Sequence, residues 1–524
     1  MADNSVSCED DGRGLVAVAN YKIFNDPVHG SIRLHPLLVD IIDTSQFQRL
    51  RDVKQLGASY WVYPGASHNR FEHCIGTAYL CGSLLRTLKE DHDQLISRTD
   101  IICAEIAGLC HDLGHGPFSH VFDHTYIKLM QPELTWTHEQ GSADMFDHML
   151  NVNKNLQRSF EKYGIWGKEI QLVKDLILGK DPVKENIPQK CIFQGREYEK
   201  WFLYEVVSNK RNGIDCDKFD YLMRDSHYIG TNSNFDFMRY VQNIRILPVD
   251  NQMQICVRDK EVFNLYQLFH TRWSLHHRVY QHKTTKIIEQ MIVEAMAKVD
   301  RVFNISDSIH DMASYTHLSD SIIYEIMRSR DKSVEVKQAK KILTMIQERN
   351  LYKFCGQVSA LCKTEDSTFP SSQEVLGKGS LGIAEEISSL DEDLCADDVF
   401  VSLIEISFGM KQHDPINSVV FFSKEGNPMK IRREEISELL PHSFLDSYIR
   451  VYSRDPEKNQ LVENCFADWC EENGFKRPCK LEGDTTGYFT DAHKDSAVKK
   501  AMQNQRLHSI KTNLHVKRSI NYNM

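Results

Sequence analysis

The residues with the clearest capacity for chemistry are an adjacent pair, His111 and Asp112, in the segment CHDLGHGPFSH. Standing together, they offer one imidazole nitrogen and one carboxylate oxygen to the same point, a donor combination that binds divalent metal ions. Two glycines follow, Gly114 and Gly116, and we expect them to leave backbone room for a ligand beside the pair. A His-Asp dipeptide alone is weak support for a metal site, so the interpretation depends on whether the chain offers further ligands.

Suitable companions occur elsewhere in the chain. His73 lies in HNRFEHCIGTAYL, which has a helical pattern, and Asp217 lies in NGIDCDKFDYLMRD. With the His-Asp pair they make two nitrogen and two oxygen ligands, which leaves positions for water and phosphate on a six-coordinate ion. His115 and His120 add groups that exchange protons near neutral pH. The alternative is a set of separate core histidines and helix-capping carboxylates.

Helices are expected to position these groups. The stretch Asp100–Cys110 is apolar nearly all round, which predicts a buried helix that ends where His111 begins. Further helices are predicted over Thr44–Leu56, which follows capping residues, and over Tyr266–Met296. A short strand is predicted at Gln254–Val257.

The chain divides by composition into several regions. We expect a flexible leader over residues 1–20, a helical catalytic domain over 21–350, and a smaller α+β lobe over 351–480. A Ser-, Gly- and acid-rich stretch at 363–397 predicts a mobile acidic loop inside that lobe, and residues 481–524 predict a weakly ordered tail. Within the lobe, strands are predicted at Val399–Ser407 and Ser418–Ser423, and a helix near Glu434–Leu440.

Composition limits the class of protein. Hydrophobic residues make up 41% of the 524 residues and charged residues 26%, as in a folded globular chain. The net charge of -10 disfavours a general nucleic-acid coat, and no apolar run is long enough for a membrane helix. The 14 cysteines form no CxxC pair, which predicts buried free thiols in a reducing compartment.

These segments resemble a known family. SHNRFEH, CHDLGHGPFSH and GIDCDKFDYLMRDSHYIG follow the order and spacing of the HD-domain deoxynucleoside triphosphate triphosphohydrolases, nearest to the vertebrate branch that also carries a SAM domain. The resemblance runs from about Tyr21 to Phe475. It includes NDPVHG, DTSQFQRLRDVKQLG, RDKEVFNLYQLFHTRWSLHHRVYQHK and LLPHSFLDSYIRVY.

The resemblance implies a mainly α-helical HD fold with a small α+β C-terminal lobe. It also implies metal-dependent hydrolysis of a dNTP to the deoxynucleoside and tripolyphosphate, which limits cellular dNTP pools and supports antiviral defence. The resemblance assigns His73, His111, Asp112 and Asp217 as ligands of the metal, which would be zinc, iron, manganese or magnesium. His115, Asp123 and His138 match the acid/base group, and His138, in WTHEQGS, matches the acid that protonates the leaving 5′-oxygen.

Residues around the substrate follow from the same resemblance. A triphosphate carries about four negative charges, which Arg and Lys side chains can answer. A tight wall at the sugar would exclude a 2′-hydroxyl and so favour deoxynucleotides. The matched substrate positions are Gln55, Leu56, Arg70, His120, Asp215, Lys218, Tyr221, Asp225, Arg272, Tyr280 and Gln281.

Two effector sites at subunit contacts are implied as well, and with them a homotetramer. The guanine-nucleotide site matches Lys22, Ile23, Asn25, Asp43, Gln48, Arg51 and Arg432. A carboxylate such as Asp43 can accept hydrogen bonds from both N1–H and N2–H of guanine, a pair that adenine lacks. The dNTP effector site matches Val62, Tyr63, Arg239, Arg258, Lys260, Asn264, His282, Lys283 and Arg477. In KIRREE the resemblance is looser and leaves open which of Lys430, Arg432 and Arg433 reaches a phosphate; Lys476 and Arg477 are similarly ambiguous.

The sequence departs from the resemblance in three ways. Only about 20 residues precede the matched region, so we expect no SAM domain. No Ser-Pro or Thr-Pro dipeptide occurs, which argues against a proline-directed phosphorylation switch. No basic nuclear-targeting run is evident, so the resemblance indicates the nucleus while the sequence leaves the cytoplasm open.

Two alternatives stay open at this point. One is an HD nucleotidase or phosphodiesterase that cleaves a different phosphate bond. The other is a nucleotide-sensing scaffold that binds single-stranded nucleic acid weakly and turns nothing over.

Overall fold

The computed structural model of the chain describes residues 21–181, 198–250, 252–361 and 369–479. The chain divides into two compact units. The first holds the residues up to Asn350 together with Ser407–Leu445, and the second holds Leu351–Ile406 together with the residues from Asp446 onward. The predicted leader (1–20) and tail (481–524) lie outside the described residues. Within the described ranges, no helix combines the length and apolar character needed to span a membrane.

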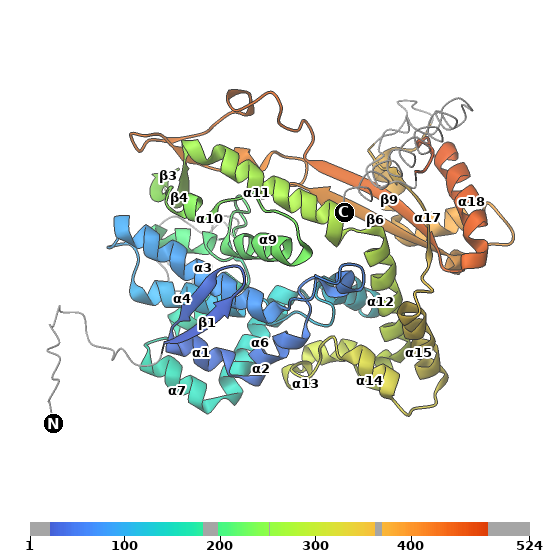
Figure 1. Ribbon diagram of the computed structural model, residues 1–524, viewed down its shortest axis with the longest axis horizontal. Coiled ribbons are helices and arrows are strands. Elements are labelled where there is room, and N and C mark those ends of the chain that lie inside the picture. Colours follow the sequence, from blue (N-terminus) through green and yellow to red (C-terminus); the bar gives the residue numbers. More distant parts are fainter. Residues whose placement is uncertain (1–20, 182–197, 251, 362–368, 480–524) are drawn as a thin grey trace, which may run out of the picture. The chain divides into compact units, whose positions relative to one another are not determined.

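Three helices that lie side by side form the centre of the first unit: α3 (Arg70–Asp91), α4 (Arg98–Cys110) and α9 (Cys216–Ile229) (Figure 1). The predicted buried helix is confirmed as α4, whose residues from Cys103 to its end are all buried. It begins two residues before the predicted start because Ser97 caps it by accepting a hydrogen bond from the backbone N–H of Asp100 at 3.1 Å.

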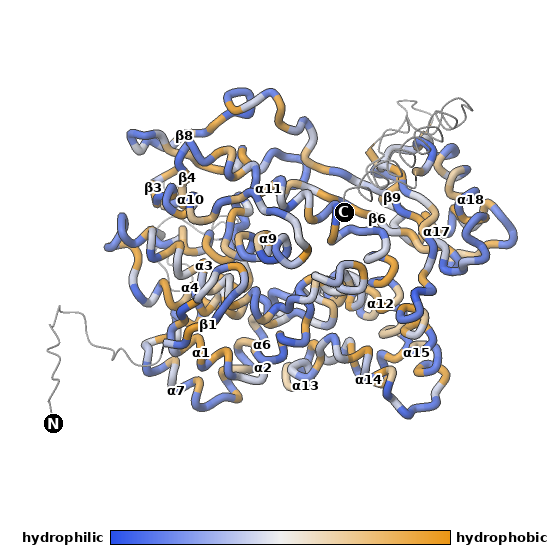
Figure 2. Tube along the Cα trace, in the orientation of Figure 1, coloured by the Kyte–Doolittle hydropathy of each residue, from blue (hydrophilic) through white to orange (hydrophobic). Residues whose placement is uncertain are grey.

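Further helices surround these three. Helix α12 (Lys283–Phe303) shows how they pack: its buried positions, such as Ile288, Met291, Ile292 and Ala295, recur on one face. Figure 2 shows hydrophobic and hydrophilic stretches alternating along this helix. The remaining helices of this unit are α1 (Pro36–Ile42), α2 (Ser45–Gln48), α5 (Ile127–Met130), α6 (His138–Val152), α7 (Lys154–Lys162), α8 (Lys168–Ile177), α10 (Phe237–Val241), α11 (Val262–Leu275), α12 (Lys283–Phe303), α13 (Met312–Tyr315), α14 (Ile322–Arg328) and α15 (Val334–Gln347).

Two predicted helices are shorter than expected. The helix predicted over Thr44–Leu56 ends as α2 and a 3-10 turn, because Val53 is extended and its carbonyl accepts the N–H of Arg70 at 2.9 Å. The helix predicted over Tyr266–Met296 is divided into α11, a π-helical turn at His276–Tyr280, and α12. The division occurs because His282 is extended and caps α12, with Nδ1 accepting from Thr284 N at 3.2 Å.

Strands in the first unit are short. The hairpin of β1 (Lys22–Asp26) and β2 (Gly30–Leu34) is antiparallel. A second sheet has the order β3-β4-β7-β8, formed by β3 (Ile244–Val249), β4 (Gln252–Arg258), β7 (Phe421–Phe422) and β8 (Pro428–Met429). The strand predicted at Gln254–Val257 lies inside β4.

The segment Ser407–Leu445 was expected in the C-terminal lobe, but it packs with the first unit. Strand β7 pairs in parallel with β4, and Tyr266 Oη donates to Asp414 Oδ2 at 2.6 Å. The strand predicted at Ser418–Ser423 is reduced to β7. The helix predicted near Glu434–Leu440 is wrong: only a 3-10 turn forms, at Arg433–Glu435, and Leu439 beyond it is 94% exposed, so it adds no buried face to support a helix.

The second unit is a small α+β body. Its sheet has the order β5-β9-β6, with β5 (Lys353–Ser359) antiparallel to β9 (Leu445–Ser453) beside β6 (Val399–Ser407), which confirms the strand predicted there. Helices α16 (Ser372–Gly377), α17 (Gly379–Ser388) and α18 (Asn459–Glu472) belong to the same unit.

The prediction of a mobile acidic loop over 363–397 is wrong for its described part, residues 369–397. That part folds into α16 and α17 because Val375, Ile383 and Ile387 enter the hydrophobic core with Trp469. Residues 362–368 lie outside the described residues.

Candidate metal and acid/base site

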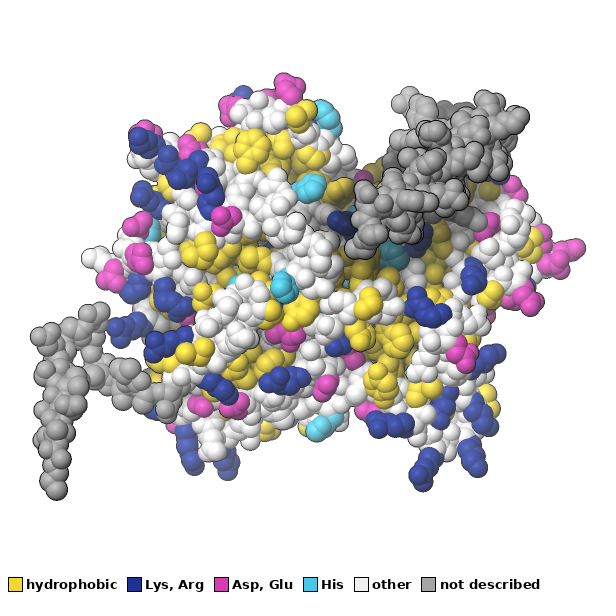
Figure 3. Space-filling model, in the orientation of Figure 1, with side chains coloured by type: hydrophobic (Ala, Val, Ile, Leu, Met, Phe, Trp, Pro, Cys, Tyr) yellow, Lys and Arg dark blue, Asp and Glu magenta, His cyan; other side chains and the backbone are white. Residues whose placement is uncertain are grey.

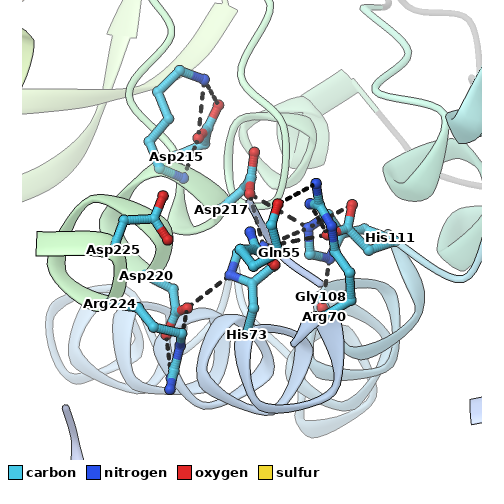
Figure 4. Close-up of polar contacts among 12 residues, drawn as sticks. Gln55, Arg70, His73, Gly108, His111, Asp215, Asp217, Asp220, Arg224 and Asp225 are labelled. Carbon is cyan, nitrogen blue, oxygen red and sulfur yellow. Dashed lines mark hydrogen bonds and ion pairs between the residues drawn. The ribbon is translucent and has the colours of Figure 1, made fainter. Parts of the chain in front are cut away.

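Four predicted metal ligands converge from the three central helices. His73 lies on the first turns of α3, His111 and Asp112 directly follow α4, and Asp217 lies on the first turn of α9 (Figure 4). The Nε2 atoms of His73 and His111 are 3.3 Å apart, and Asp217 Oδ1 lies 3.2 and 3.4 Å from them. Asp112 Oδ1 lies 3.4 Å from His111 Nε2 and Oδ2 lies 3.5 Å from His73 Nε2.

The tautomers of the two histidines fit a metal ion. His73 Nδ1 lies 2.7 Å from the carboxylate of Asp220, and His111 Nδ1 lies 2.8 Å from the carbonyl of Gly108. Both partners are acceptors, so Nδ1 carries the hydrogen and the Nε2 lone pairs face each other. Two lone pairs 3.3 Å apart are stabilised by a shared cation, and ligand histidines held by carboxylates or carbonyls are usual at metal sites.

The pKa shifts of these residues also favour a bound cation. Burial lowers the pKa of His73, but the hydrogen bonds with Asp217 and Asp220 outweigh burial and raise it to about 10. Burial raises the pKa of Asp217, and the two histidines outweigh it and hold that pKa well below the usual range. The site thus attracts positive charge, which a bound ion supplies in place of protons.

Asp220 and Arg224, one turn apart on α9, hold the ligand His73 in place. Arg224 donates Nε and Nη2 to Asp220 at 2.8 and 2.9 Å, and donates Nη1 to Asp26 at 2.9 Å. His29 Nε2 lies 2.6 Å from Asp220 Oδ1, whereas His73 contacts Oδ2. Asp220 and Arg224 are fully buried, so each charge in this network depends on its neighbours. Asp26, His29, Asp220 and Arg224 were not predicted as part of the site.

The predicted acid/base group assembles next to the metal ligands. His138 Nδ1 lies 2.6 Å from Asp123 Oδ2, and the His138 ring stacks on His115 with centroids 4.1 Å apart. His115 Nε2 lies 3.3 Å from Asp112 Oδ1, which joins the two groups. Burial lowers the pKa of His138, but the hydrogen bond with Asp123 outweighs burial and raises it. His138 is therefore suited to hold a proton and release it.

The two glycines after the His-Asp pair have a role different from the predicted one. A Cβ on Gly114 would lie 2.2 Å from the carbonyl oxygen of His138, and one on Gly116 would lie 2.3 Å from the ring of Phe122. The space beside them is filled by protein, so the expectation that they leave room for a ligand is wrong. Gly114 lets the first turn of α6, with His138, pack against the metal-binding turn, and Gly116 makes room for the Phe122 ring.

The predicted substrate residues make several separate sets of contacts. Arg70 donates Nη1 to Asp112 at 2.6 Å, Nε to Ser119 Oγ at 3.0 Å and Nη2 to the Gln55 carbonyl at 3.3 Å, so its guanidinium orients a metal ligand. Lys218 Nζ lies 3.0 Å from Asp215, the residue that caps α9.

A second group of predicted substrate residues centres on Asp225. Asp225 accepts from Tyr280 Oη at 2.5 Å, and His68 Nε2 lies 2.6 Å from its other oxygen. Arg272 donates to the carbonyl of Ser407. The other predicted substrate residues are exposed (His120), partly buried (Leu56, Tyr221, Gln281) or buried with the side-chain oxygen lacking a partner among the described residues (Gln55).

The predicted guanine-nucleotide residues lie on exposed or half-exposed surface. Lys22, Ile23 and Asn25 are exposed on β1, and Asp43 is exposed at the end of α1. Gln48 accepts from Arg51 Nε at 2.8 Å, which joins two of the predicted residues.

The KIRREE segment holds three basic candidates for a phosphate contact, Lys430, Arg432 and Arg433, and their contacts differ. Lys430 Nζ donates to the Val419 carbonyl at 2.9 Å and Arg433 Nη2 to the Leu440 carbonyl at 2.5 Å. Arg432 is exposed.

The predicted dNTP-effector residues form two groups of contacts. Tyr63 lies edge-on to His282 with centroids 5.7 Å apart, and Val62 and Lys283 adjoin them in sequence. Arg239 and Asn264 share the buried Glu261, at 2.8 and 3.1 Å. Arg258 donates to Asp259 at 2.9 Å; Lys260 and Arg477 are exposed.

Two protein-family models match the chain. Residues 70–180 match the HD domain, and residues 235–403 match the HD associated region. His73, His111 and Asp112 lie in the first match, whereas Asp217 lies between the two.

Curated relatives agree with these matches. The human protein called deoxynucleoside triphosphate triphosphohydrolase SAMHD1 is 44% identical over 88% of this chain and 75% of its own length. The zebrafish protein of the same name is 44% identical over 87% of this chain and 75% of its own length. A Dictyostelium discoideum homologue is 36% identical over 85% of this chain and 80% of its own length. With its HD domain and this identity over most of its length, the chain belongs to the SAMHD1 family of HD-domain deoxynucleoside triphosphate triphosphohydrolases.

Proposed function

We propose that this protein hydrolyses a dNTP at the α-phosphorus and releases the deoxynucleoside and tripolyphosphate. The observation that carries the proposal is the series of contacts that links the four-ligand metal site to a proton-holding histidine: His115 lies 3.3 Å from Asp112 and stacks on His138. Cleavage at the α-phosphorus needs a proton for the departing 5′-oxygen close to a metal-activated phosphate, and the two groups supply these functions.

His73, His111, Asp112 and Asp217 would hold the ion, which is zinc, iron, manganese or magnesium. When bound, it would polarise a phosphoryl oxygen and lower the pKa of a water. Asp123 fixes one ring nitrogen of His138, so the protonated ring can donate its other N–H to the 5′-oxygen. Arg70 keeps Asp112 in position by its 2.6 Å hydrogen bond.

Lys218, Arg272 and His120 would meet the phosphates, and Asp225 with Tyr280 the sugar edge. The Tyr280–Asp225 hydrogen bond fixes both side chains, which would make a closed wall against a 2′-hydroxyl. This accounts for a preference for deoxynucleotides.

Product identification tests the proposal. Purified protein with Mg²⁺ or Mn²⁺ and dATP should yield deoxyadenosine and tripolyphosphate by chromatography and phosphorus NMR. His111→Ala should abolish turnover, and His317→Ala, which alters an exposed histidine, should not. Diphosphate or monophosphate products would favour a nucleotidase or phosphodiesterase instead.

GTP and dNTP are the proposed effectors, and their sites would assemble a homotetramer. In support, Gln48 and Arg51 form one contact on an exposed surface with Asp43 nearby in sequence, and Arg432 is available to a phosphate. Activity that rises with GTP, together with a concentration-dependent tetramer in sedimentation, is the expected result.

A second candidate function rests on surface charge. Lys and Arg side chains gather at the edge formed by α14 and α15 (Figure 3), where Arg328, Arg330, Lys332, Lys337 and Lys341 are exposed. Such a patch supports weak binding of single-stranded nucleic acid. Affinity that falls steeply with salt, in a protein without turnover, would favour this function over hydrolysis.

A further inference from the structure

His68 is a buried histidine that the proposed reaction does not use. Its Nε2 lies 2.6 Å from Asp225 Oδ1, and its Nδ1 has no hydrogen-bond partner among the described residues. The ring stacks on Tyr228 of α9, with centroids 4.5 Å apart and an interplanar angle of 21°. A carboxylate oxygen only accepts, so Nε2 carries the hydrogen and donates it to Asp225. Within the described residues, this side chain therefore makes its hydrogen bond to a single carboxylate.

The backbone of His68 holds a second proposed substrate residue. The His68 carbonyl accepts the N–H of Gln55 at 3.1 Å, and Lys54 and Asn69 beside them form an antiparallel bridge. The side-chain oxygen of Gln55 is buried and has no hydrogen-bond partner in the described part of the chain. One residue thus contacts Asp225 through its side chain and Gln55 through its main chain.

Asp225 and Gln55 both present hydrogen-bond acceptors. Asp225 Oδ2 accepts from Tyr280 Oη at 2.5 Å, and each of its oxygens keeps a further lone pair. The sugar of a dNTP has one hydroxyl, at C3′, because the 5′-oxygen carries the triphosphate and C2′ carries only hydrogen. A hydroxyl can donate, so the 3′-hydroxyl is the sugar group that these acceptors can bind. Such a donor would also relieve the cost of the buried Gln55 oxygen.

We propose that His68 is a positioning residue, which holds Asp225 and Gln55 for the 3′-hydroxyl and so sets the preference of the enzyme for substrates that carry this group. The inference rests on the proposed function, since it takes a dNTP as the substrate. Without the donor of His68, Asp225 would keep Tyr280 as a partner but lose the second contact that fixes the plane of its carboxylate. The 3′-hydroxyl would then meet an acceptor that is no longer oriented, whereas the metal ligands and the proposed phosphate contacts would be unchanged.

Two substitutions separate the hydrogen bond of His68 from its ring. His68→Phe keeps a ring against Tyr228 and removes the donor, whereas His68→Gln removes the ring and keeps an N–H that can reach Asp225. His317→Phe makes the first exchange at an exposed histidine and serves as the control. In one reaction with GTP, dATP competes with a large excess of 2′,3′-dideoxy-ATP, which lacks only the 3′-hydroxyl. Both substrates then meet the same enzyme, and the products, counted by mass spectrometry, give the ratio of the two kcat/KM values.

We expect His68→Phe to lower the ratio of kcat/KM for dATP to that for dideoxy-ATP by about 10- to 100-fold, because an oriented hydrogen bond to a charged group is lost only with dATP. His68→Gln should recover most of the ratio, and His317→Phe should keep it. A purely structural role would lower both substrates alike, so an unchanged ratio in His68→Phe, or an equal fall in His68→Gln, would overturn the inference. If wild type does not hydrolyse dATP, only the proposed function fails. The affinities of the two nucleotides, measured by calorimetry in the same variants, should then show the same difference, and an equal change for both nucleotides would overturn the role of His68.

Discussion

Replacing Gly76 by alanine should damage the metal site without touching a ligand. Gly76 lies on α3 one turn after His73, and a Cβ there would lie 1.9 Å from Asp220 Oδ1 and 2.5 Å from Arg224 Nη2. Both side chains are fully buried and hold each other by two hydrogen bonds, so neither can move into solvent. The added methyl must therefore displace the carboxylate that holds His73 Nδ1.

The size of the effect follows from two opposed contributions. Alanine in a helix interior gains about 0.5–1 kcal/mol over glycine, whereas overpacking a buried site costs about 1–3 kcal/mol, so folding should weaken by about 0–2.5 kcal/mol. Loss of a partner that orients a metal-binding histidine lowers metal affinity by about 10- to 100-fold. The affinity change is thus the more sensitive readout.

Gly82→Ala on the same helix is a matched control. Its Cβ would lie 2.0 Å from Glu105 Oε1 and 2.6 Å from Arg86 Nη2, again at a carboxylate–guanidinium pair. Arg86 is 51% exposed and can turn toward water, whereas the Glu105 carboxylate is buried, as that of Asp220 is. Metal affinity is measured by competition with a chromophoric chelator, and stability by denaturant unfolding with excess chelator. If both variants fold and bind metal as wild type does, the assigned role of Asp220 is wrong.

Three further substitutions give four predictions. Asp123→Asn removes the charge that raises the pKa of His138, so the alkaline limb of the kcat–pH profile should move to lower pH; an unmoved limb would exclude His138 as the acid. The stability that this pair contributes is lost as pH rises through the folded pKa of His138, and it also decreases as pH falls below the unfolded pKa of Asp123. The Asn variant should therefore lose most stability, against wild type in urea, between the unfolded-state pKa values of Asp and His, about 4 and 6.5. Asp43→Ala should abolish activation by GTP in the dATP assay and leave metal content unchanged; normal activation would refute the effector assignment. Ser371→Ala removes the cap of α16, with Glu374 N donating to Ser371 Oγ at 3.2 Å, and should destabilise the second unit by about 0.5–2 kcal/mol in denaturant unfolding; no change would mean that the cap is replaced by water.

The parts of the site that sequence could predict are those with a local signature. A buried helix followed at once by His111 and Asp112 is visible as an apolar run with a polar end, and α4 has that form. The distant ligands His73 and Asp217 were suggested by their residue types and segments and then matched by the resemblance, but no local pattern states that α3 and α9 converge on the end of α4. The structure brings all four donor groups together.

The parts that sequence missed depend on tertiary contacts. Asp220 and Arg224 stand four residues apart on α9, the spacing of an ordinary surface ion pair, and only burial against His73 distinguishes them. Gly114 and Gly116 suggested space for a ligand because sequence does not show which neighbour fills that space. The region 369–397 has few large apolar residues, yet Val375, Ile383 and Ile387 recur closely enough to form one buried face.

The network behind His73 also gives the N-terminal hairpin a physical connection to the metal site. Asp26 ends β1 and accepts from Arg224, which holds Asp220, which in turn holds His73. Buried charges of this kind have few alternative partners, so a shift of β1 changes the orientation of His73 unless the whole network adjusts. Three of the residues proposed to bind a guanine nucleotide, Lys22, Ile23 and Asn25, lie on that same strand. A nucleotide that fixes β1 would therefore favour one arrangement of a metal ligand, and activation would not require any movement of the proposed acid.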